Sequence, residues 1–361
     1  MPAEVYRKLC ETMARRAGDY PGKDLPEFFE LVEFLFTPEE AGISNAIPRG
    51  FSPVGAVAAA AGKSEAETAD ILERMADKGL ATAIDIGGTM VYHGPPFVPG
   101  IFEYQFMRGT KTDRDRQAAR LIHAYKTAYD AVADHVQVKF PFSRTIAVDR
   151  VIKGGNQVQT YNQVAAYIEN AEDIAIGTCF CRHEAELLDE KDVCGKPNDV
   201  CMSFGPGAKF LIDRKISRRA DKAQALDALK RSEEAGLVHC TTNRRDIDFL
   251  CNCCADHCMI IKGALRQPKP ALALNSGFKP VFDAETCTGC ETCITICPAQ
   301  ALVMGAEGSP AVDLDRCFGC GVCANLCPSE AVVLDVRSDI APPPPDRKAF
   351  KEALKAANAG A

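Results

Sequence analysis

One cysteine pattern, present twice with its copies thirty residues apart, constrains this chain more than any other feature. Each copy reads Cys-x2-Cys-x2-Cys-x3-Cys-Pro, from Cys287 to Pro298 and from Cys317 to Pro328. Two-residue turns let the first three thiolates of a run surround one iron–sulfur cube, while the fourth cysteine of the run ligates the other cube. The spacing therefore predicts two 4Fe–4S clusters, with Cys287, Cys290, Cys293 and Cys327 on the first and Cys317, Cys320, Cys323 and Cys297 on the second.

Zinc sites and disulfides explain this pattern less well. A zinc knuckle closes one tetrahedral site with pairs of cysteines and needs neither a third evenly spaced cysteine nor a Cys-Pro ending. Residues 282–336 resemble the bacterial-type two-4Fe–4S ferredoxins in the small residues inside each run and in the Pro-x-x-Ala continuations from Pro298 and Pro328. The resemblance covers about a sixth of the chain. It implies a C-terminal domain that transfers single electrons between its clusters.

A second group of cysteines lies upstream, where nine thiols fall within eighty residues. They are Cys179, Cys181, Cys194, Cys201, Cys240, Cys251, Cys253, Cys254 and Cys258. Buried structural cysteines would be scattered, whereas these form Cys-x-Cys and Cys-x-Cys-Cys-x3-Cys groups, and disulfides are rare in the cytoplasm. We therefore expect a third iron–sulfur cluster or another metal site here, held by some of these thiols.

The ligand set of this central site stays open between two arrangements. If residues 249–262 form a helix, Cys251, Cys254 and Cys258 share one face, and Cys253 points elsewhere. A fourth thiol would then come from Cys240 or from a cysteine at the end of the upstream strand, Cys179 or Cys181. Alternatively, four upstream cysteines form a site of their own: Cys179, Cys181, Cys194 and Cys201.

The upstream cysteines, with the segments EEAGLVHCTTN and FLCNCCADHC, resemble multi-domain 4Fe–4S proteins of anaerobic bacteria in which a cysteine-rich domain precedes a two-cluster ferredoxin. This resemblance extends over residues 140–340 and implies an architecture without a defined reaction. The sequence contains no phosphate loop and no dinucleotide fingerprint, and it establishes no nucleophile–base pair. Catalytic residues are therefore unknown at this point.

The formal net charge of −7 is concentrated in the ferredoxin-like segment. Eight acidic residues between Val281 and Val336 are opposed by one cation, Arg316, so this segment alone carries −7. An acidic redox module favours docking to basic patches on redox partner proteins through salt-sensitive contacts. Because the chain has no long apolar run and no apolar stretch near its start, we expect a cytoplasmic protein without a transmembrane segment.

The first hundred residues predict helices followed by a hairpin. Apolar periodicity predicts helices over residues 27–36, 53–61 and 64–78, and alternation around Gly87-Gly88 predicts a hairpin over residues 81–93. This order is typical of a winged helix. The helix over residues 64–78 carries five acidic residues against two basic ones, a poor face for phosphates. We therefore expect this part to dock to a partner or to dimerise, and consider DNA binding unlikely.

Later segments complete the predicted organisation. Helices are expected over residues 110–137 and 162–171 and strands over residues 145–152 and 173–177, while Ser217 is expected to cap a helix through Leu229. The fold class is therefore α+β with four parts. These are a winged-helix-like docking domain (1–109), a cysteine-rich α/β domain (110–278), a two-cluster ferredoxin domain (279–338), and a Pro-rich linker with a basic tail (339–361), either loosely held or a partner anchor.

The leading functional hypothesis is an iron–sulfur electron-transfer protein or a subunit of an anaerobic oxidoreductase complex. It would pass single electrons between two ferredoxin clusters and the central site, and catalysis would belong to a partner. One alternative is a reductase whose central cluster has an open coordination position and receives electrons from its own ferredoxin. A redox-responsive regulator that acts through the winged helix is the third hypothesis.

Overall fold

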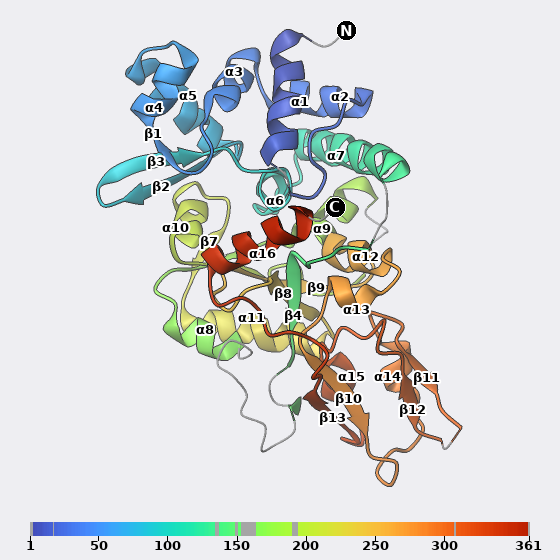
Figure 1. The fold of residues 1–361 in the computed structure, drawn as a ribbon. Helices are drawn as coiled ribbons and strands as arrows, with labels where there is room; N and C mark the ends of the chain where they lie inside the picture. The colour runs from blue at the N-terminus through green and yellow to red at the C-terminus, as the bar shows by residue number, and fades with distance from the viewer. Residues whose placement is uncertain are drawn as a thin grey trace. The chain divides into compact units, whose positions relative to one another are not determined.

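The computed structural model describes residues 3–16, 18–133, 137–148, 151–152, 164–189, 194–306 and 308–359. Helices account for 44% and strands for 17%, which fits a mixed α+β protein. The chain forms two compact units (Figure 1). The first comprises Met1–Asp134, Gly177–Val193 and Pro206–Arg219, and the second comprises His135–Ile176, Cys194–Gly205 and Ala220–Ala361.

Five helices open the first unit: α1 (Glu4–Arg16), α2 (Pro26–Leu35), α3 (Pro38–Ala46), α4 (Val54–Ala61) and α5 (Glu65–Asp77). Polar side chains define where two of them begin. Thr37 and Glu40 form a reciprocal capping box at α3, and the Ser64 hydroxyl accepts a hydrogen bond from the Glu67 backbone N–H at α5. The three helices predicted in this region are confirmed as α2, α4 and α5.

A small antiparallel sheet follows these helices, with strand order β1-β3-β2. β2 (Thr82–Ile86) and β3 (Thr89–His93) form the predicted hairpin, and β1 (Ser52–Pro53) pairs with the outer side of β3. The two-residue turn needs left-handed backbone at both positions, and Gly87 and Gly88 have φ of 61° and 84°. These elements of the first unit thus follow the order three helices, strand β1, two helices and hairpin.

The remaining helices of the first unit include a long one, and two of the others pack against it. α7 (Asp113–Val132) begins at a Thr112–Asp115 capping box and buries Ala118, Ala119, Ile122 and Tyr125. It accounts for most of the helix predicted over residues 110–137, of which residues 134–136 lie outside the described part. α6 (Ile101–Phe106), α9 (Phe180–Leu188) and α10 (Gly205–Asp213) complete the unit, and the rings of Phe106 and Phe180 stack with centroids 5.5 Å apart.

The second unit is built on a six-stranded sheet with the order β4-β8-β9-β6-β5-β7. Its strands are β4 (Ser143–Ile146), β5 (Ile174–Gly177), β6 (Cys201–Phe204), β7 (Arg218–Ala220), β8 (Val238–Thr242) and β9 (Phe249–Cys253). The predicted strand at β5 and the predicted helix at α8 (Val164–Asn170) are confirmed. The strand predicted over residues 145–152 agrees with β4 only at residues 145–146, because β4 begins at Ser143 and ends at Ile146. Residues 149–150 and 162–163 of these predictions lie outside the described part. The helix after β7, α11 (Lys222–Glu234), is capped by Asp221, so the expected Ser217 cap is wrong: Arg218–Ala220 is strand.

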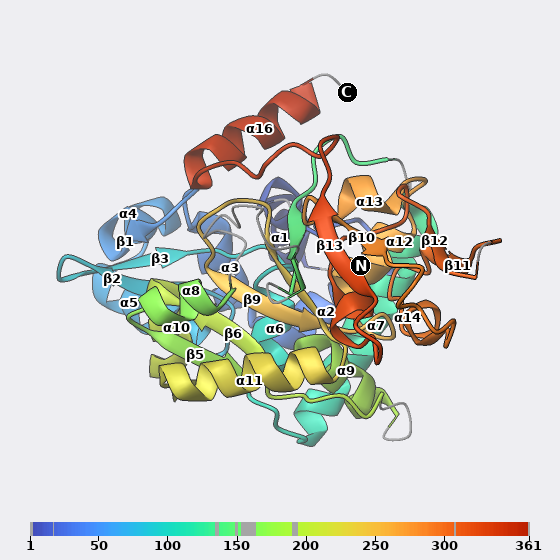
Figure 2. The same ribbon diagram turned by 90° about the horizontal axis from the view of Figure 1, so that it is seen from below.

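Apolar residues cover both faces of this sheet. On one face, Met202, Phe204 and Leu250 pack with residues of α8 and α11, and Figure 2 shows α11 running alongside β5 and β6. On the other face, Val238, Cys240 and Cys253 pack with Ile261 of α12 (Met259–Leu265) and with residues of the ferredoxin-like segment. Several candidate ligands meet on this second face, namely Cys240, Cys251, Cys253, Cys258, Cys297, Cys317 and Cys320.

The ferredoxin-like segment has two similar halves. Its elements are β10 (Phe278–Phe282), α14 (Thr292–Thr295), β11 (Leu302–Met304), β12 (Pro310–Val312), α15 (Val322–Asn325) and β13 (Val332–Val336). β10 pairs antiparallel with β13, and β11 pairs antiparallel with β12, so the first and last strands of the segment meet. Each half therefore contributes one short helix inside its cysteine run, and this helix contains the third cysteine of the run (Figure 1).

The C-terminal tail is docked on the second unit, contrary to the expectation that it is loosely held. Phe350 of α16 (Arg347–Ala359) is only 5% exposed, and its ring lies 5.9 Å from that of Phe140 and 5.6 Å from that of Phe142. The Arg245 backbone N–H donates to the Pro344 carbonyl, which holds the polyproline linker. Among the helices of the described residues, none combines the length and apolarity that crossing a bilayer requires.

Candidate iron–sulfur centres

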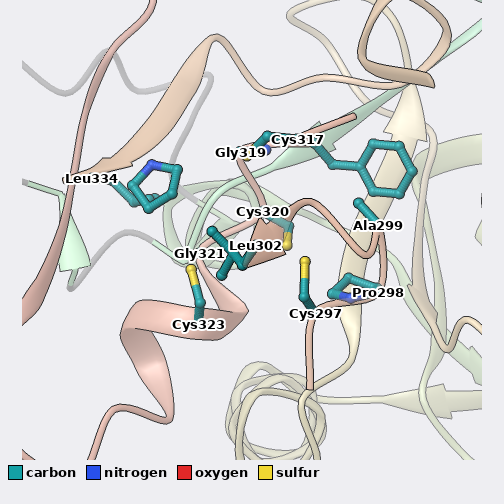
Figure 3. Close-up of a pocket in the computed structure, with 12 residues that line it drawn as sticks. Cys297, Pro298, Ala299, Leu302, Cys317, Gly319, Cys320, Gly321, Cys323 and Leu334 are labelled. Atoms are coloured by element: carbon teal, nitrogen blue, oxygen red, sulfur yellow. Dashed lines mark hydrogen bonds between the residues drawn. The ribbon is translucent and has the colours of Figure 1, made fainter. Parts of the chain in front are cut away.

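The second cysteine set consists of Cys297, Cys317, Cys320 and Cys323, and all four line one pocket. Pro298, Leu302 and Leu334 are among the apolar residues that complete its wall, and Figure 3 shows the sulfurs of Cys297 and Cys320 pointing toward one another. Three of the thiols come from one run and the fourth from the other, the same grouping that the spacing predicts. Four convergent thiols in a small apolar pocket are the donor set that a 4Fe–4S cluster requires.

The first cysteine set consists of Cys287, Cys290, Cys293 and Cys327, and these four line a separate pocket. Thr292 and Ser329 lie on the same wall, and their hydroxyls contact the sulfurs of Cys290 and Cys327 at 3.4 and 3.6 Å. This set again combines three thiols of one run with the last thiol of the other. The donor chemistry therefore fits a second cluster of the same kind.

The two sets differ in burial. Burial raises the pKa of Cys317 to about 11 and that of Cys320 to about 12, whereas a hydrogen bond from Thr292 lowers the pKa of Cys290. Cys290 is exposed, so the first set reaches solvent. In the second set, backbone N–H groups of Ala301 and Gly319 donate to the sulfurs of Cys297 and Cys317, each at 3.4 Å. Such hydrogen bonds stabilise thiolates and tune cluster potentials.

The helix expected over residues 249–262 is wrong. Residues Phe249–Cys253 form strand β9, residues 254–257 turn, and α12 begins only after Cys258, its N-cap. β9 pairs antiparallel with β8, and the hydrogen bonds between these two strands would be lost if residues 249–253 were helical. Cys251, Cys254 and Cys258 therefore do not share a helical face.

Strand pairing selects a different group of thiols. Cys251 lies opposite Cys240 and Cys253 lies opposite Val238, so Cys240, Cys251 and Cys253 share one face of the sheet. The Cys253 thiol also makes side-chain contacts with the thiols of Cys240, Cys251 and Cys258. We call Cys240, Cys251, Cys253 and Cys258 the central cysteine set. A hydrogen bond from Cys253 lowers the pKa of Cys240, but burial and the nearby thiols of Cys258 and Cys251 together raise it to about 11.

The other upstream cysteines divide between the two units. Cys179 and Cys181 belong to the first unit, where Cys179 is the N-cap residue of α9 and Cys181 is helical, so the strand does not stay extended as far as these cysteines. Cys201 begins β6 in the second unit, and one more step of the β6–β9 register places it opposite Cys251. Cys194 and Cys254 approach Asp256, a residue that the sequence reasoning missed. Its place two residues after Cys254 was the available signal.

The central set lies close to the second set. Cys240, Cys253 and Cys258 belong to the same apolar cluster as Cys317, with Cys320 packed against it. Hydrogen bonds tie the second cysteine run to the sheet: the Thr145 hydroxyl donates to the Phe318 carbonyl at 2.8 Å, and the Val148 N–H donates to the Cys320 carbonyl at 3.2 Å. The two groups of thiols are therefore held within one packed core.

Comparison with known proteins assigns one segment of the chain to a family. Residues 286–331 match the family of 4Fe–4S dicluster domains. This segment is an iron–sulfur, electron-transfer module. The match contains every cysteine of the first and second sets and ends just before β13 begins. No curated protein sequence matches the chain significantly, so the resemblance of the cysteine-rich region to multi-domain proteins is not established by comparison.

Proposed function

We propose that this chain is an electron-transfer protein with three 4Fe–4S sites, held by the first, second and central cysteine sets. The main evidence for the third site is that four thiols come together from β8, β9 and the residue before α12. They lie on one face of the sheet, in the apolar cluster that also contains Cys317. Each bound cluster would accept or donate one electron at a time. The protein supplies the ligands, the dry surroundings and the fixed spacing between them.

The donor chemistry of the central set supports a cluster. Four thiols are the usual ligand set of a 4Fe–4S cluster, and Cys240, Cys253 and Cys258 are each less than 5% exposed. Thiolates in such surroundings are strongly disfavoured unless cations compensate their charge, which the irons of a cluster would do. Apolar packing against Val238 and Ile261 also keeps water away from these sulfurs.

The order of the three sites follows from burial. The second set shares its core with the central set, and the first set includes the exposed Cys290. We therefore place the exchange of electrons with a redox partner at the first set. Exposed acidic residues surround its runs, namely Asp283, Glu285, Glu291 and Glu330. A partner with a basic docking surface fits this face.

We propose that the first unit is a winged-helix-like domain that docks to a partner protein. Its helix α5 offers few free cations: Arg74 pairs with Asp70 and Glu39, and Lys78 pairs with Glu40 at 2.7 Å. A face of paired cations and exposed carboxylates repels phosphates. We therefore propose protein docking for this unit instead of DNA binding.

Iron and sulfide analysis of the anaerobically purified chain, with EPR, tests the third site. We expect about twelve irons per chain, because three cubes hold four each. Cys258→Ser should lower this to about eight and remove one EPR component, while the interacting signals of the two ferredoxin clusters persist. Cys10→Ala, at a buried thiol of the first unit, is the matched control and should leave the iron content unchanged. About eight irons in the unmodified chain would overturn the third site.

A further inference from the structure

Two upstream cysteines and an aspartate form a group separate from all three cysteine sets. The Cys194 and Cys254 sulfurs and a carboxylate oxygen of Asp256 all lie within 4.8 Å of one another. Cys254 is 3% exposed and packs in the apolar cluster with Leu250 and Val200, on the face of the sheet opposite the central set. We propose that this group binds a single Zn²⁺ ion, independently of the clusters.

The number and spacing of the donor atoms fit one ion. Around a tetrahedral Zn²⁺ with bonds of about 2.0–2.3 Å, neighbouring donors stand roughly 3.3–3.8 Å apart. The three donors need to move little to reach that separation. A 4Fe–4S cube usually takes four thiolates, whereas this group offers two thiols and one carboxylate.

The chemistry of the donors selects the metal. Two thiolates disfavour Mg²⁺ and Ca²⁺, which take oxygen ligands, and a carboxylate disfavours Cu(I). Two sulfurs and one oxygen are common partners of Zn²⁺. Because Asp256 is exposed, the remaining coordination position opens toward solvent, where a water or a small anionic ligand would complete the tetrahedron.

The local backbone brings these donors together. Residues 254–257 form a turn closed by a hydrogen bond from the Cys258 N–H to the Cys254 carbonyl at 3.3 Å. The turn directs successive cysteines to different sites, since Cys253 belongs to the central set while Cys254 faces Cys194. The same short segment would therefore contribute to a cluster site and to a zinc site.

Zinc analysis of the full chain tests this proposal. After anaerobic purification from zinc-supplemented cells, we expect about one zinc per chain, and zinc-edge X-ray absorption should resolve two sulfur scatterers at about 2.3 Å with oxygen ligands at about 2.0–2.2 Å. Cys254→Ser and Asp256→Asn should each lower zinc retention against a chelator at least tenfold. Asp213→Asn, at an exposed aspartate of the first unit, is the control and should retain zinc.

Because Asp256 is exposed, the Asp256→Asn variant should fold normally. This variant therefore still tests the zinc site if Cys254→Ser fails to fold. Absence of zinc, four sulfur scatterers around it, or full retention in Asp256→Asn would each overturn the proposal. Iron content and EPR of the same samples report on the clusters, so failure of the zinc site is distinguishable from failure of the proposed electron-transfer function. A lower iron content in the Asp256→Asn variant would also overturn the proposal, because the aspartate would then contribute to binding a cluster.

Discussion

Equivalent glycines in the two cysteine runs have the same backbone conformation but different neighbours. Gly289 and Gly319 both have left-handed backbone, with φ of 66° and 63°. A Cβ on Gly319 would lie 2.2 Å from the Phe278 carbonyl oxygen, whereas a Cβ on Gly289 would meet its nearest neighbour only at 3.7 Å. The second run therefore packs closely against the start of β10 at Gly319, whereas the first run has free space around Gly289.

This difference predicts unequal effects of one substitution. Left-handed backbone costs an alanine about 1–2 kcal/mol, so Gly289→Ala should destabilise the segment by that amount and retain its iron. Gly319→Ala adds a backbone overlap that only a shift of β10 or of the run can relieve. We expect the loss of about four irons per chain, measured by iron analysis. Equal iron content in the two variants would contradict this account.

At the scale of elements, strand pairing determines which cysteines form the central set. The spacing Cys-x-Cys-Cys-x3-Cys is compatible with a helix, but alternation of Cys251 and Cys253 is also the period of a strand. The choice depends on β8, whose Cys240 lies eleven residues away in sequence and directly opposite Cys251. Local periodicity contains no information on that partner. Helices with strong caps, such as α5 and α7, were predictable because their signals are local.

The cap of α6 predicts a pH dependence in the first unit. Burial raises the pKa of Glu103 to about 7, although its carboxylate accepts a hydrogen bond from the Gly100 N–H at 2.7 Å, and Asp19 raises the pKa further while Lys126 lowers it. The folded state therefore binds the proton more tightly than the unfolded state does. Its stability should fall by about 3 kcal/mol as pH rises from about 4.5 to about 7.

Denaturant unfolding followed by tyrosine fluorescence measures this effect, because six of the eight tyrosines lie in the first unit and the chain has no tryptophan. Glu103→Gln keeps an acceptor for Gly100 and should flatten the pH profile. Glu30→Gln, at an exposed position of α2, should leave the profile unchanged. A Glu103→Gln profile as steep as that of the unmodified chain would show that another group is responsible.

At the scale of the whole molecule, the negative charge gathers on the electron-transfer module. The net charge of the chain is −7, and the segment from Val281 to Val336 carries the same value. Four of its exposed carboxylates, those of Asp283, Glu285, Glu291 and Glu330, lie close in sequence to ligands of the first set, which includes the exposed Cys290. Charge and solvent access therefore coincide at the first set, where we place the exchange of electrons.

This coincidence predicts salt-sensitive electron transfer to a small basic redox protein. Raising the ionic strength from about 0.01 to about 0.15 M shortens the Debye length from about 30 to about 8 Å, so the second-order rate should fall about tenfold or more. Stopped-flow kinetics would measure it. Glu285→Gln with Glu291→Gln should lower the low-salt rate, whereas Glu11→Gln in α1 should not. A rate that is independent of salt would exclude docking through this face.

The amino-acid sequence by itself determined the first and second cysteine sets, because turns of two residues bring their thiols together and the repeat supplies each fourth ligand. Only the tertiary structure decided how the upstream cysteines divide. Cys240 joins Cys251 through strand pairing, and Cys254 turns toward Cys194 across a long stretch of chain. Contacts within a run follow from the short chain between residues, whereas contacts between distant segments depend on which strands pair and which faces are buried.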